Sequence, residues 1–218
     1  MKYPSFAREN QDLFILSVLG SKTKGTYVEI GAYMPVEDNN TYLLENQFEW
    51  KGISLEFYEE YSSRWKAVRN NPCITCDATT VNYTELFEEN NLPNHIDFLQ
   101  IDIDPTSANY KVLELIDFEK YSFSIVTFEH NLYLSGDKSY YDGEDCDFYR
   151  KKSREFLLDR GYTCLVPDVS HGDKVFEDWF INEKHMELDN WKKFIDIDPV
   201  MNTPDMKEST RKVFEELL

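Results

Sequence analysis

The sequence predicts an open α/β fold with a mostly parallel seven-stranded sheet, helices on both faces and an antiparallel strand at one edge. Strand-like and helix-like segments alternate through five consecutive units. Because the crossovers between such units are right-handed, the five strands are expected to lie parallel in one sheet. Two later strand-like segments are separated only by a short polar loop (170–174), so we expect them to pair antiparallel at an edge.

The expected strands are apolar runs rich in β-branched and aromatic residues, which is typical of strands buried between helices. In chain order they are TYVEIG (26–31), KGISLEF (51–57), CITCDA (73–78), IDFLQIDID (96–104), SFSIVTFEHN (122–131), YTCLVPDV (162–169) and FEDWFIN (176–182).

The expected helices have apolar residues at helical spacing and recognisable ends. They cover residues 11–20, 40–48, 58–71, 82–90, 107–118, 148–161 and 205–218. The first ends at a C-cap glycine, Gly20, and Ser107 is a candidate N-cap of the fifth.

The 218 residues are expected to form a single domain (1–218), since 41% are hydrophobic and 15% aromatic, which is ample for a core. Residues 1–25 read as an N-terminal helical extension and 183–218 as a C-terminal one. The acidic, tyrosine-rich segment 132–147 is longer than typical connections, so we interpret it as a lid over an acceptor site; a mobile surface loop is the alternative.

The charge balance excludes several partners. Twenty-three basic against 41 acidic residues give a net charge of −18, which disfavours nucleic acid and anionic membranes and favours a neutral or cationic substrate. There is no apolar run long enough to span a membrane and no apolar N-terminal stretch typical of a signal peptide. Four cysteines suggest a reducing compartment, so a cytoplasmic location is expected.

One cysteine pair has a spacing that invites a zinc interpretation. Cys73 and Cys76 form a C-x-x-C motif. Residues three apart on a strand point to opposite faces, and no second pair follows, so we interpret both as small core residues.

Each of the five parallel strands ends at a carboxylate. These residues are Glu29, Glu56, Asp77, Asp102 with Asp104, and Glu129. Ligands of open α/β sheets bind beyond the carboxyl ends of the strands. A single acid there is more often a helix cap or a solvated loop residue, but like charges at one rim repel. The group therefore indicates a ligand that carries a cation, ribose hydroxyls or an adenine amino group.

The individual strand ends suggest how a nucleoside could bind. Gly31 would allow close approach of the backbone to a ligand, and Glu56 would accept hydrogen bonds from both ribose hydroxyls. Asp77, with the backbone of Ala78 beside it, would accept from an adenine amino group. The segment GAYMPVEDN lacks the G-x-G-x-x-G cradle for a pyrophosphate. S-adenosylmethionine, which has a sulfonium cation and no phosphate, therefore matches these acidic strand ends better than a dinucleotide cofactor does.

Several segments together resemble one family. ENQDLFIL, YVEIGAYMPVEDNNTYLLE, FEWKGISLEF, IDFLQIDID, VLELIDF, FEHN, SREFLLDRGYTCL and EDWFIN are similar to segments of the FkbM family of class I S-adenosylmethionine-dependent methyltransferases. The resemblance covers about residues 11–182 and implies a Rossmann-like fold. It also implies methylation of hydroxyl groups on sugars or on glycosylated and polyketide-type acceptors.

The resemblance assigns cofactor contacts by position. Glu29, Gly31 and Ala32 would border the methionine part, Asn40 and Thr41 match the family's NT pair, Glu56 would hold the ribose, Asp77 and Ala78 the adenine, and Asp102 the amino group or sulfonium. The chain departs from the family pattern at Met34 and Pro35, where small residues are usual. It also departs at Pro105 and Thr106, where many members have glycine and an acid.

Methyl transfer to a hydroxyl needs an aligned acceptor and a base for its proton. His130 is the candidate base because its unperturbed pKa is about 6.5, and Asp104 and Glu129 would orient it or act in its place. The alternative for His130 is a structural histidine bonded to a carboxylate. A second version of the mechanism uses a divalent cation such as Mg²⁺, with ligands drawn from Asp102, Asp104, Glu129, His130 and Asn131.

The expected acceptor is a sugar, a nucleotide-sugar or a glycan, on which Tyr133, Tyr140 and Tyr141 of the lid segment could stack. Two other functions stay open from the sequence. One is a nicotinamide-dependent oxidoreductase on a Rossmann-like fold, and the other is a non-catalytic module that binds a nucleoside or glycan.

Overall fold

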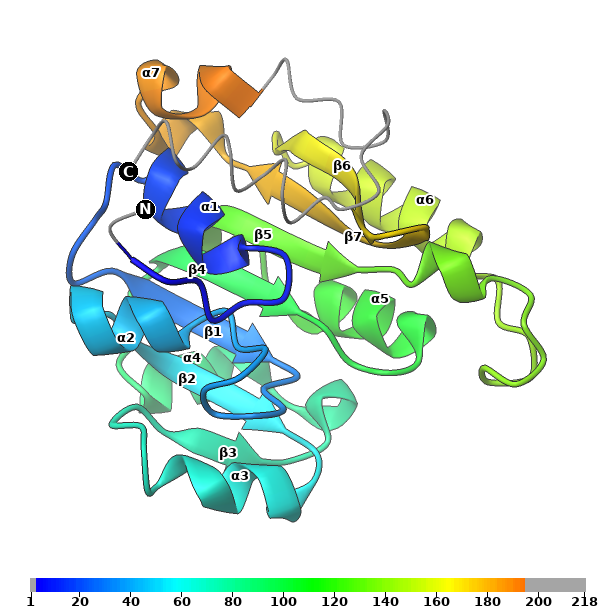
Figure 1. Ribbon diagram of the computed structural model, residues 1–218, viewed down its shortest axis with the longest axis horizontal. Coiled ribbons are helices and arrows are strands. Elements are labelled where there is room, and N and C mark those ends of the chain that lie inside the picture. The colour runs from blue at the N-terminus through cyan, green and yellow to red at the C-terminus, as the bar shows by residue number, and fades with distance from the viewer. Residues whose placement is uncertain (1–2, 195–218) are drawn as a thin grey trace.

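The protein's structure, a computed structural model, describes residues 3–194 and contains one seven-stranded sheet in the order β3-β2-β1-β4-β5-β7-β6 (Figure 1). The strands are β1 (Thr26–Ile30), β2 (Lys51–Glu56), β3 (Cys73–Thr75), β4 (His95–Ile101), β5 (Ser122–Glu129), β6 (Thr163–His171) and β7 (Lys174–Ile181). Only β7 is reversed, since it pairs antiparallel with both β5 and β6. The predicted fold class is confirmed, with one refinement: the reversed strand lies one place in from the edge, which β6 occupies.

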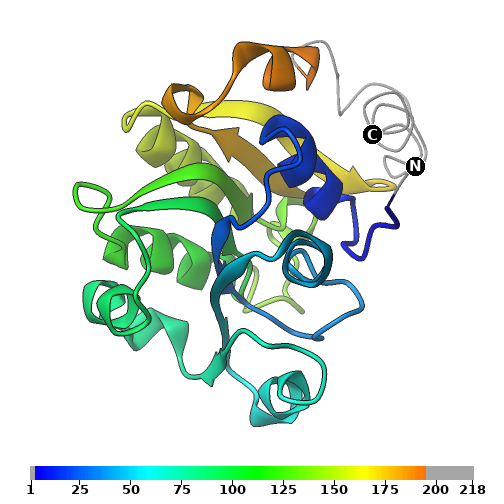
Figure 2. The same cartoon turned by 90° about the vertical axis from the view of Figure 1, so that its left-hand side faces the viewer.

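Helices cover both faces of this sheet (Figure 2). The α-helices are α1 (Gln11–Val18), α2 (Tyr42–Phe48), α3 (Glu59–Trp65), α4 (Tyr83–Glu89), α5 (Thr106–Leu115), α6 (Cys146–Leu158) and α7 (Leu188–Trp191). Short 3-10 turns occur at η1 (Ala78–Thr80), η2 (Leu132–Leu134), η3 (Glu183–His185) and η4 (Lys192–Phe194). The helix expected at 205–218 lies outside the described residues.

Two hydrophobic clusters bury the two faces. Residues of α1, α2 and α7 pack on one face with Tyr27 of β1. Residues of α4, α5 and α6 pack on the other with Val28 and Ile30. Since successive side chains of a strand alternate between faces, Glu29 points toward the α1–α2 side, like Tyr27. Within residues 3–194, no helix is long and apolar enough to cross a membrane.

The order of the strands places a crevice at the centre of the sheet. From β1 the chain proceeds to β2 and β3 on one side, and it then returns to β4 on the other side of β1. The two adjacent strands β1 and β4 therefore lead into connections that diverge. This is the switch point at which open α/β sheets bind ligands.

Candidate active site

A cavity of about 800 Å³ opens beyond the carboxyl ends of β1, β2 and β4. Strand-end residues that line it are Gly31, Glu56, Asp77, Ala78, Asp102, Asp104 and Glu129. Asn40 and Gln100 also line it, together with Arg8, Gln11, Tyr33, Asp38, Phe57, Tyr58, Tyr61, Tyr141 and Phe176. The volume is within the range of small-molecule and cofactor sites.

Gly31 is required by the contact between β1 and β4. Its φ is +89°, and a Cβ at this position would lie 1.7 Å from the carbonyl oxygen of Asp102. No side chain fits at that distance, so Gly31 brings the two strand ends together at the wall of the cavity. The close approach is to a neighbouring strand of the protein itself.

Glu56 has both carboxylate oxygens held by the backbone. Oε2 accepts from the N–H of Tyr33 and Oε1 from the N–H of Tyr58, each at 2.8 Å. A carboxylate has about four acceptor positions, so two are left for a ligand. The side chain is therefore fixed in the cavity wall and can accept from two further donors.

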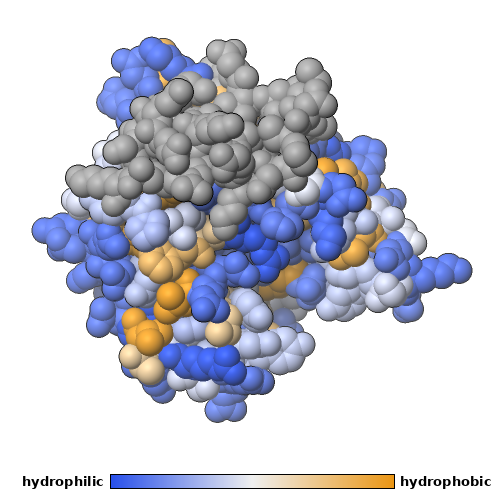
Figure 3. All heavy atoms as spheres, in the orientation of Figure 1, coloured by the Kyte–Doolittle hydropathy of each residue, from blue (hydrophilic) through white to orange (hydrophobic). Residues whose placement is uncertain are grey.

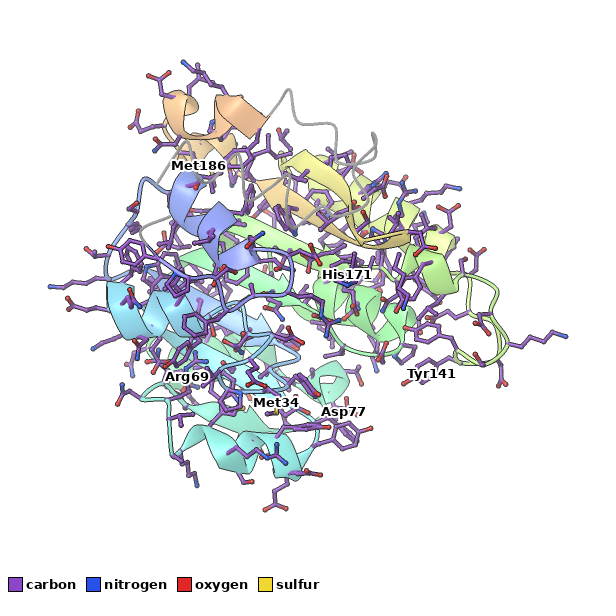
Figure 4. The ribbon with its side chains drawn as sticks, viewed as in Figure 1. Met34, Arg69, Asp77, Tyr141, His171 and Met186 are labelled. Carbon is purple, nitrogen blue, oxygen red and sulfur yellow. The ribbon has the colours of Figure 1, made fainter. Side chains whose placement is uncertain are left out.

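Asp77 lies beyond β3 and is exposed to the cavity (Figure 4). Its Oδ1 accepts from the side-chain hydroxyl and the backbone N–H of Thr79, at 2.8 and 2.9 Å. These two bonds lower the pKa of Asp77, so the group stays ionised. Among the described residues its Oδ2 forms no hydrogen bond, and it can accept from a ligand amino group beside Ala78.

The loop after β1 divides the predicted cofactor residues into two sets. Asn40 lines the cavity and donates through Nδ2 to Oε1 of Gln100 at 2.8 Å. Ala32 and Thr41 are buried and do not line it. Thr41 Oγ1 instead accepts from Nη2 of Arg69 at 2.8 Å.

Glu29 also lies behind the cavity wall and is completely buried. It accepts hydrogen bonds from Asn39 Nδ2 (3.1 Å), Thr41 Oγ1 (3.1 Å) and Ser54 Oγ (2.7 Å). Burial raises the pKa of Glu29 to about 7, although the charge of Arg69 opposes this shift. The geometry makes Glu29 the anchor of the loop at 32–41 and not a group that faces the ligand.

Asp102 and Glu129 form a hydrogen-bonded carboxyl pair at the junction of β4 and β5. Burial raises the pKa of both groups, and the charge and hydrogen bond of Asp102 raise that of Glu129 further. The two carboxyl groups therefore compete for a shared proton. Behind the pair, Glu177 of β7 has a pKa of about 8, because it is buried and because Asp102 is negatively charged. Asp104 is exposed and accepts from the Tyr140 hydroxyl at 2.7 Å.

His130 is turned away from this cavity, which corrects its expected position. Its Nε2 lies 3.5 Å from Asp178 Oδ1 and 3.9 Å from Asp168 Oδ1, and its Nδ1 accepts from the N–H of Leu132 at 3.2 Å. The side chain is completely buried. The physical reason is strand alternation: Glu129 points into the cavity, so the next residue points to the other side. The alternative interpretation, a structural histidine beside a carboxylate, matches this geometry.

The five predicted metal ligands do not all meet. Asp102, Asp104 and Glu129 line the cavity, whereas His130 and Asn131 do not. Asn131 Nδ2 donates to Glu129 Oε2 at 2.8 Å, so the amide of Asn131 turns its N–H group, and not its oxygen, toward Glu129. In the part of the chain that the structure describes, the three residues whose ligand atoms lie within 4.8 Å of one another are His130, Asp168 and Asp178.

In the group of His130, Asp168 and Asp178, an arginine already pairs with both carboxylates. Nη2 of Arg154 lies 2.7 Å from Asp178 Oδ1 and 2.8 Å from Asp168 Oδ1. These are the same oxygens that a metal ion would need. Although burial opposes ionisation of Asp178, its bonds to Arg154 and His130 keep the pKa below its ordinary value. The carboxylates of this group are therefore already paired with arginine.

Several cavity residues were not found from the sequence. Phe57 and Tyr58, each 62% exposed, follow Glu56 directly, and Tyr33 packs edge-on against Tyr61 with ring centroids 4.8 Å apart. The position of two aromatic residues directly after a strand-end acid was a sequence signal that could have identified them as cavity residues. The N-terminal residues Arg8 and Gln11 carried no comparable local pattern.

The segment expected to be a lid is partly helical. It begins with the turn η2, and α6 starts at Cys146, two residues earlier than predicted. Of its three tyrosines, Tyr141 lines the cavity and Tyr140 bonds to Asp104, while Tyr133 does not line the cavity. In Figure 4 Tyr141 lies to the right of Asp77, on the side of this segment.

Comparison with protein-family models and with curated proteins gave no match. Solved structures do match. An O-methyltransferase from Bacillus cereus in complex with S-adenosylhomocysteine (SAH) is 15% identical, over 83% of each chain, with a TM-score of 0.53. A candidate rRNA methylase from Clostridium thermocellum is 10% identical, over 82% of this chain and 99% of that one, with a TM-score of 0.51. At such identities the likeness concerns the fold, and this chain has the Rossmann-like methyltransferase fold.

Proposed function

We propose that this protein is an S-adenosylmethionine-dependent O-methyltransferase that methylates a hydroxyl group of a sugar, nucleotide-sugar or glycan. The observation that carries the proposal is the cavity at the switch point of a methyltransferase fold, with Glu56 held by two backbone N–H groups in its wall. The resemblance to the FkbM family supports the choice of acceptor.

The residues present fit the cofactor. Glu56 would accept from the two ribose hydroxyls, and Asp77 Oδ2 from the adenine amino group, with Phe57 exposed beside them. Asp102 would bind the amino group. When bound, the cofactor supplies an already activated methyl group, so the protein has only to position the acceptor and remove its proton.

We assign the proton acceptor to Glu129 in place of His130. A positive charge bound beside the Asp102–Glu129 pair favours loss of the proton that the two carboxyl groups share. The freed carboxylate of Glu129, whose pKa is raised by burial, is a stronger base than an exposed one. It would take the hydroxyl proton as the acceptor oxygen gains the methyl group. Asp104, which also lines the cavity, is the second candidate.

The lining favours a neutral ring over a nucleic acid. Arg8 is the one basic residue among the described residues that line the cavity, against six acids: Asp38, Glu56, Asp77, Asp102, Asp104 and Glu129. A phosphate backbone would be repelled by this charge. Tyr33, Tyr58 and Tyr141 instead offer ring faces and hydroxyls to a sugar.

The test is transfer of labelled methyl groups from S-adenosylmethionine to a panel of sugars, nucleotide-sugars and oligosaccharides, with RNA as the competing acceptor. We expect transfer to a sugar hydroxyl that persists in chelator. Glu129→Gln should lower kcat about 100-fold or more while SAH affinity changes little, and Glu89→Gln, an exposed acid outside the cavity, should leave both unchanged.

The other outcomes are informative in different ways. Label found in RNA would overturn the acceptor assignment. Tight SAH binding with no labelled product from any acceptor would support a non-catalytic module. Binding of a nicotinamide dinucleotide in preference to SAH would support the oxidoreductase alternative.

A further inference from the structure

We infer that Arg8 binds the carboxylate of the cofactor's methionine part, so that the N-terminal segment at 5–10, here called the strap, forms part of the cofactor site. The inference rests on the proposed function and adds to it a binding residue from outside the strands. It follows from how the strap is held, from the charges in the cavity and from the chemistry of an amino acid.

The strap is held in place at several points just before α1, whose ribbon it leads into (Figure 1). Asp12 of α1 accepts from Ser5 Oγ at 2.7 Å and from the N–H of Phe6 at 2.8 Å. The carbonyl of Phe6 accepts from the N–H of Asn39, in the loop after β1, at 3.1 Å. These bonds position the backbone on both sides of Arg8.

A second set of contacts joins the strap region to the hairpin β6–β7. Oε1 of Glu9 lies 2.6 Å from Nδ1 of His171, and Gln11 Nε2 donates to Glu177 Oε1 at 3.2 Å. The strap therefore extends from the loop after β1 to the hairpin. Arg8 lies between these two attachments and lines the cavity.

Arg8 is available to a ligand. Among the described residues it forms an ion pair with Asp38, at 3.2 Å, and both side chains are about half exposed (56% and 49%). Such surface pairs are weak, because water and salt screen them. The guanidinium has five N–H donors, arranged to match a carboxylate. Arg8 lines the same cavity as Asp102 and Glu129.

The methionine part of the cofactor requires a basic group near Asp102. The ammonium and carboxylate of a methionine share one carbon, so both must lie in the same part of the cavity. If Asp102 takes the ammonium, the carboxylate comes close to Glu129 and Asp104, which repel it. Arg8 is the one basic side chain of the described lining that can offset this repulsion.

Calorimetric titration with two ligands tests the inference. S-adenosylhomocysteine carries the amino acid, whereas 5′-methylthioadenosine has the same nucleoside and lacks both charged groups. We expect Arg8→Ala to raise the Kd for S-adenosylhomocysteine at least about tenfold and to leave the Kd for methylthioadenosine unchanged. The Kd of Arg8→Lys for S-adenosylhomocysteine should lie between those of the wild type and Arg8→Ala, because lysine keeps the charge and loses the planar fork.

Lys152→Ala is the matched control. Lys152 is on α6, forms a surface ion pair with Glu155 at 2.9 Å and does not line the cavity, so its loss changes the net charge in the same way. It should change neither Kd. Thermal unfolding of Arg8→Ala would show that the fold is kept.

The remaining outcomes separate this inference from the proposed function. Equal weakening of both ligands by Arg8→Ala would mean that Arg8 only holds the strap, and an unchanged Kd for both would mean that it has no part in binding; either overturns the inference. If the wild-type protein binds neither ligand, the proposed function itself fails.

Discussion

Gly31 shows how a single residue determines the geometry of the cavity wall. It combines a left-handed φ of +89° with contact to the backbone of Asp102. Gly161, after α6, has a similar φ of +82° but nothing within 4 Å of a would-be Cβ. The two glycines therefore separate the cost of backbone strain from the cost of a steric clash.

We expect Gly31→Ala to lower the free energy of unfolding by more than about 3 kcal/mol, since the clash adds to the strain. Gly161→Ala, with strain alone, should cost about 1–2 kcal/mol. Urea unfolding of both variants measures the difference. Equal costs would contradict the close packing of β1 against β4.

Glu177 is a buried carboxyl group whose protonation is linked to stability. Its pKa is raised from 4.5 to about 8, first by burial and then by the charge of Asp102, while Trp179 Nε1 and Gln11 Nε2 donate to Oε1. The folded protein thus holds this proton more tightly than the unfolded chain does. Stability from this group is full below pH 4.5 and is lost as the pH rises toward 8.

Glu177→Gln imitates the protonated form and should remove this dependence. Between pH 5 and 8 the unfolding free energy of the wild type should fall relative to that of the variant, by at most about 1.4 kcal/mol per pH unit. Urea unfolding at several pH values gives both curves. Parallel curves would show that Glu177 is ionised in the folded protein.

At the scale of elements, the connection between β5 and α6 is tied to the end of β4. The Tyr140 hydroxyl donates to Asp104 at 2.7 Å and lies 3.4 Å from Asn131 Nδ2. At its far end, the Oδ1 of Asp145 accepts from the N–H of Phe148 and caps α6. The segment is thus held at Tyr140 and at Asp145, and Tyr141 between them lines the cavity.

Loss of the Tyr140 hydroxyl should loosen this segment without touching the cofactor residues. We expect Tyr140→Phe to raise the KM for the acceptor several-fold, about what one hydrogen bond to a charged group contributes, and to leave the Kd for S-adenosylhomocysteine unchanged. Tyr133→Phe, outside the cavity lining, is the control. A change in cofactor affinity alone would place the segment at the cofactor and not at the acceptor.

Strands and helices could be predicted from the sequence because their hydrophobic patterns are local. The directions of side chains near the ends of these elements could not. The apolar runs located all seven strands, because parallel strands buried on both faces leave a continuous signal. The predicted start of α6 is two residues late because its N-cap, Asp145, lies in an acidic loop where one more aspartate is not distinctive. The prediction for His130 is wrong because consecutive residues at a strand end point to opposite sides, so Glu129 and His130 cannot both face the cavity.

At the scale of the whole molecule, the strand-end rule located the cavity but not all of its walls. Glu56, Asp77, Asp102, Asp104 and Glu129 meet there because parallel strands share one edge. Glu29 was expected among them, yet it points to the α1–α2 side, where Arg69 and the loop after β1 surround it. The contacts of the strap region with the loop after β1 and with the hairpin β6–β7 join residues about 30 or more positions apart, and no local pattern encodes them.

The surface charge agrees with the choice of a sugar-type acceptor over a nucleic acid. The chain carries a net charge of −18, and the face seen in Figure 3 is mostly hydrophilic around scattered apolar areas. Such a molecule repels polyanions over distances of about the Debye length, roughly 8–10 Å in physiological salt. The aromatic side chains that do reach solvent include four at the cavity: Tyr33, Phe57, Tyr58 and Tyr141.

The most direct test of an adenosyl site at the sheet's switch point is calorimetric titration of S-adenosylhomocysteine into the wild-type protein and Glu56→Gln. Glu89→Gln, an exposed acid outside the cavity, serves as control. We predict one site in the wild type and the control, and a Kd at least about tenfold higher in Glu56→Gln, because an amide cannot accept from both ribose hydroxyls while meeting two backbone N–H groups. Absence of binding to the wild type, or equal affinity in all three proteins, would contradict the site.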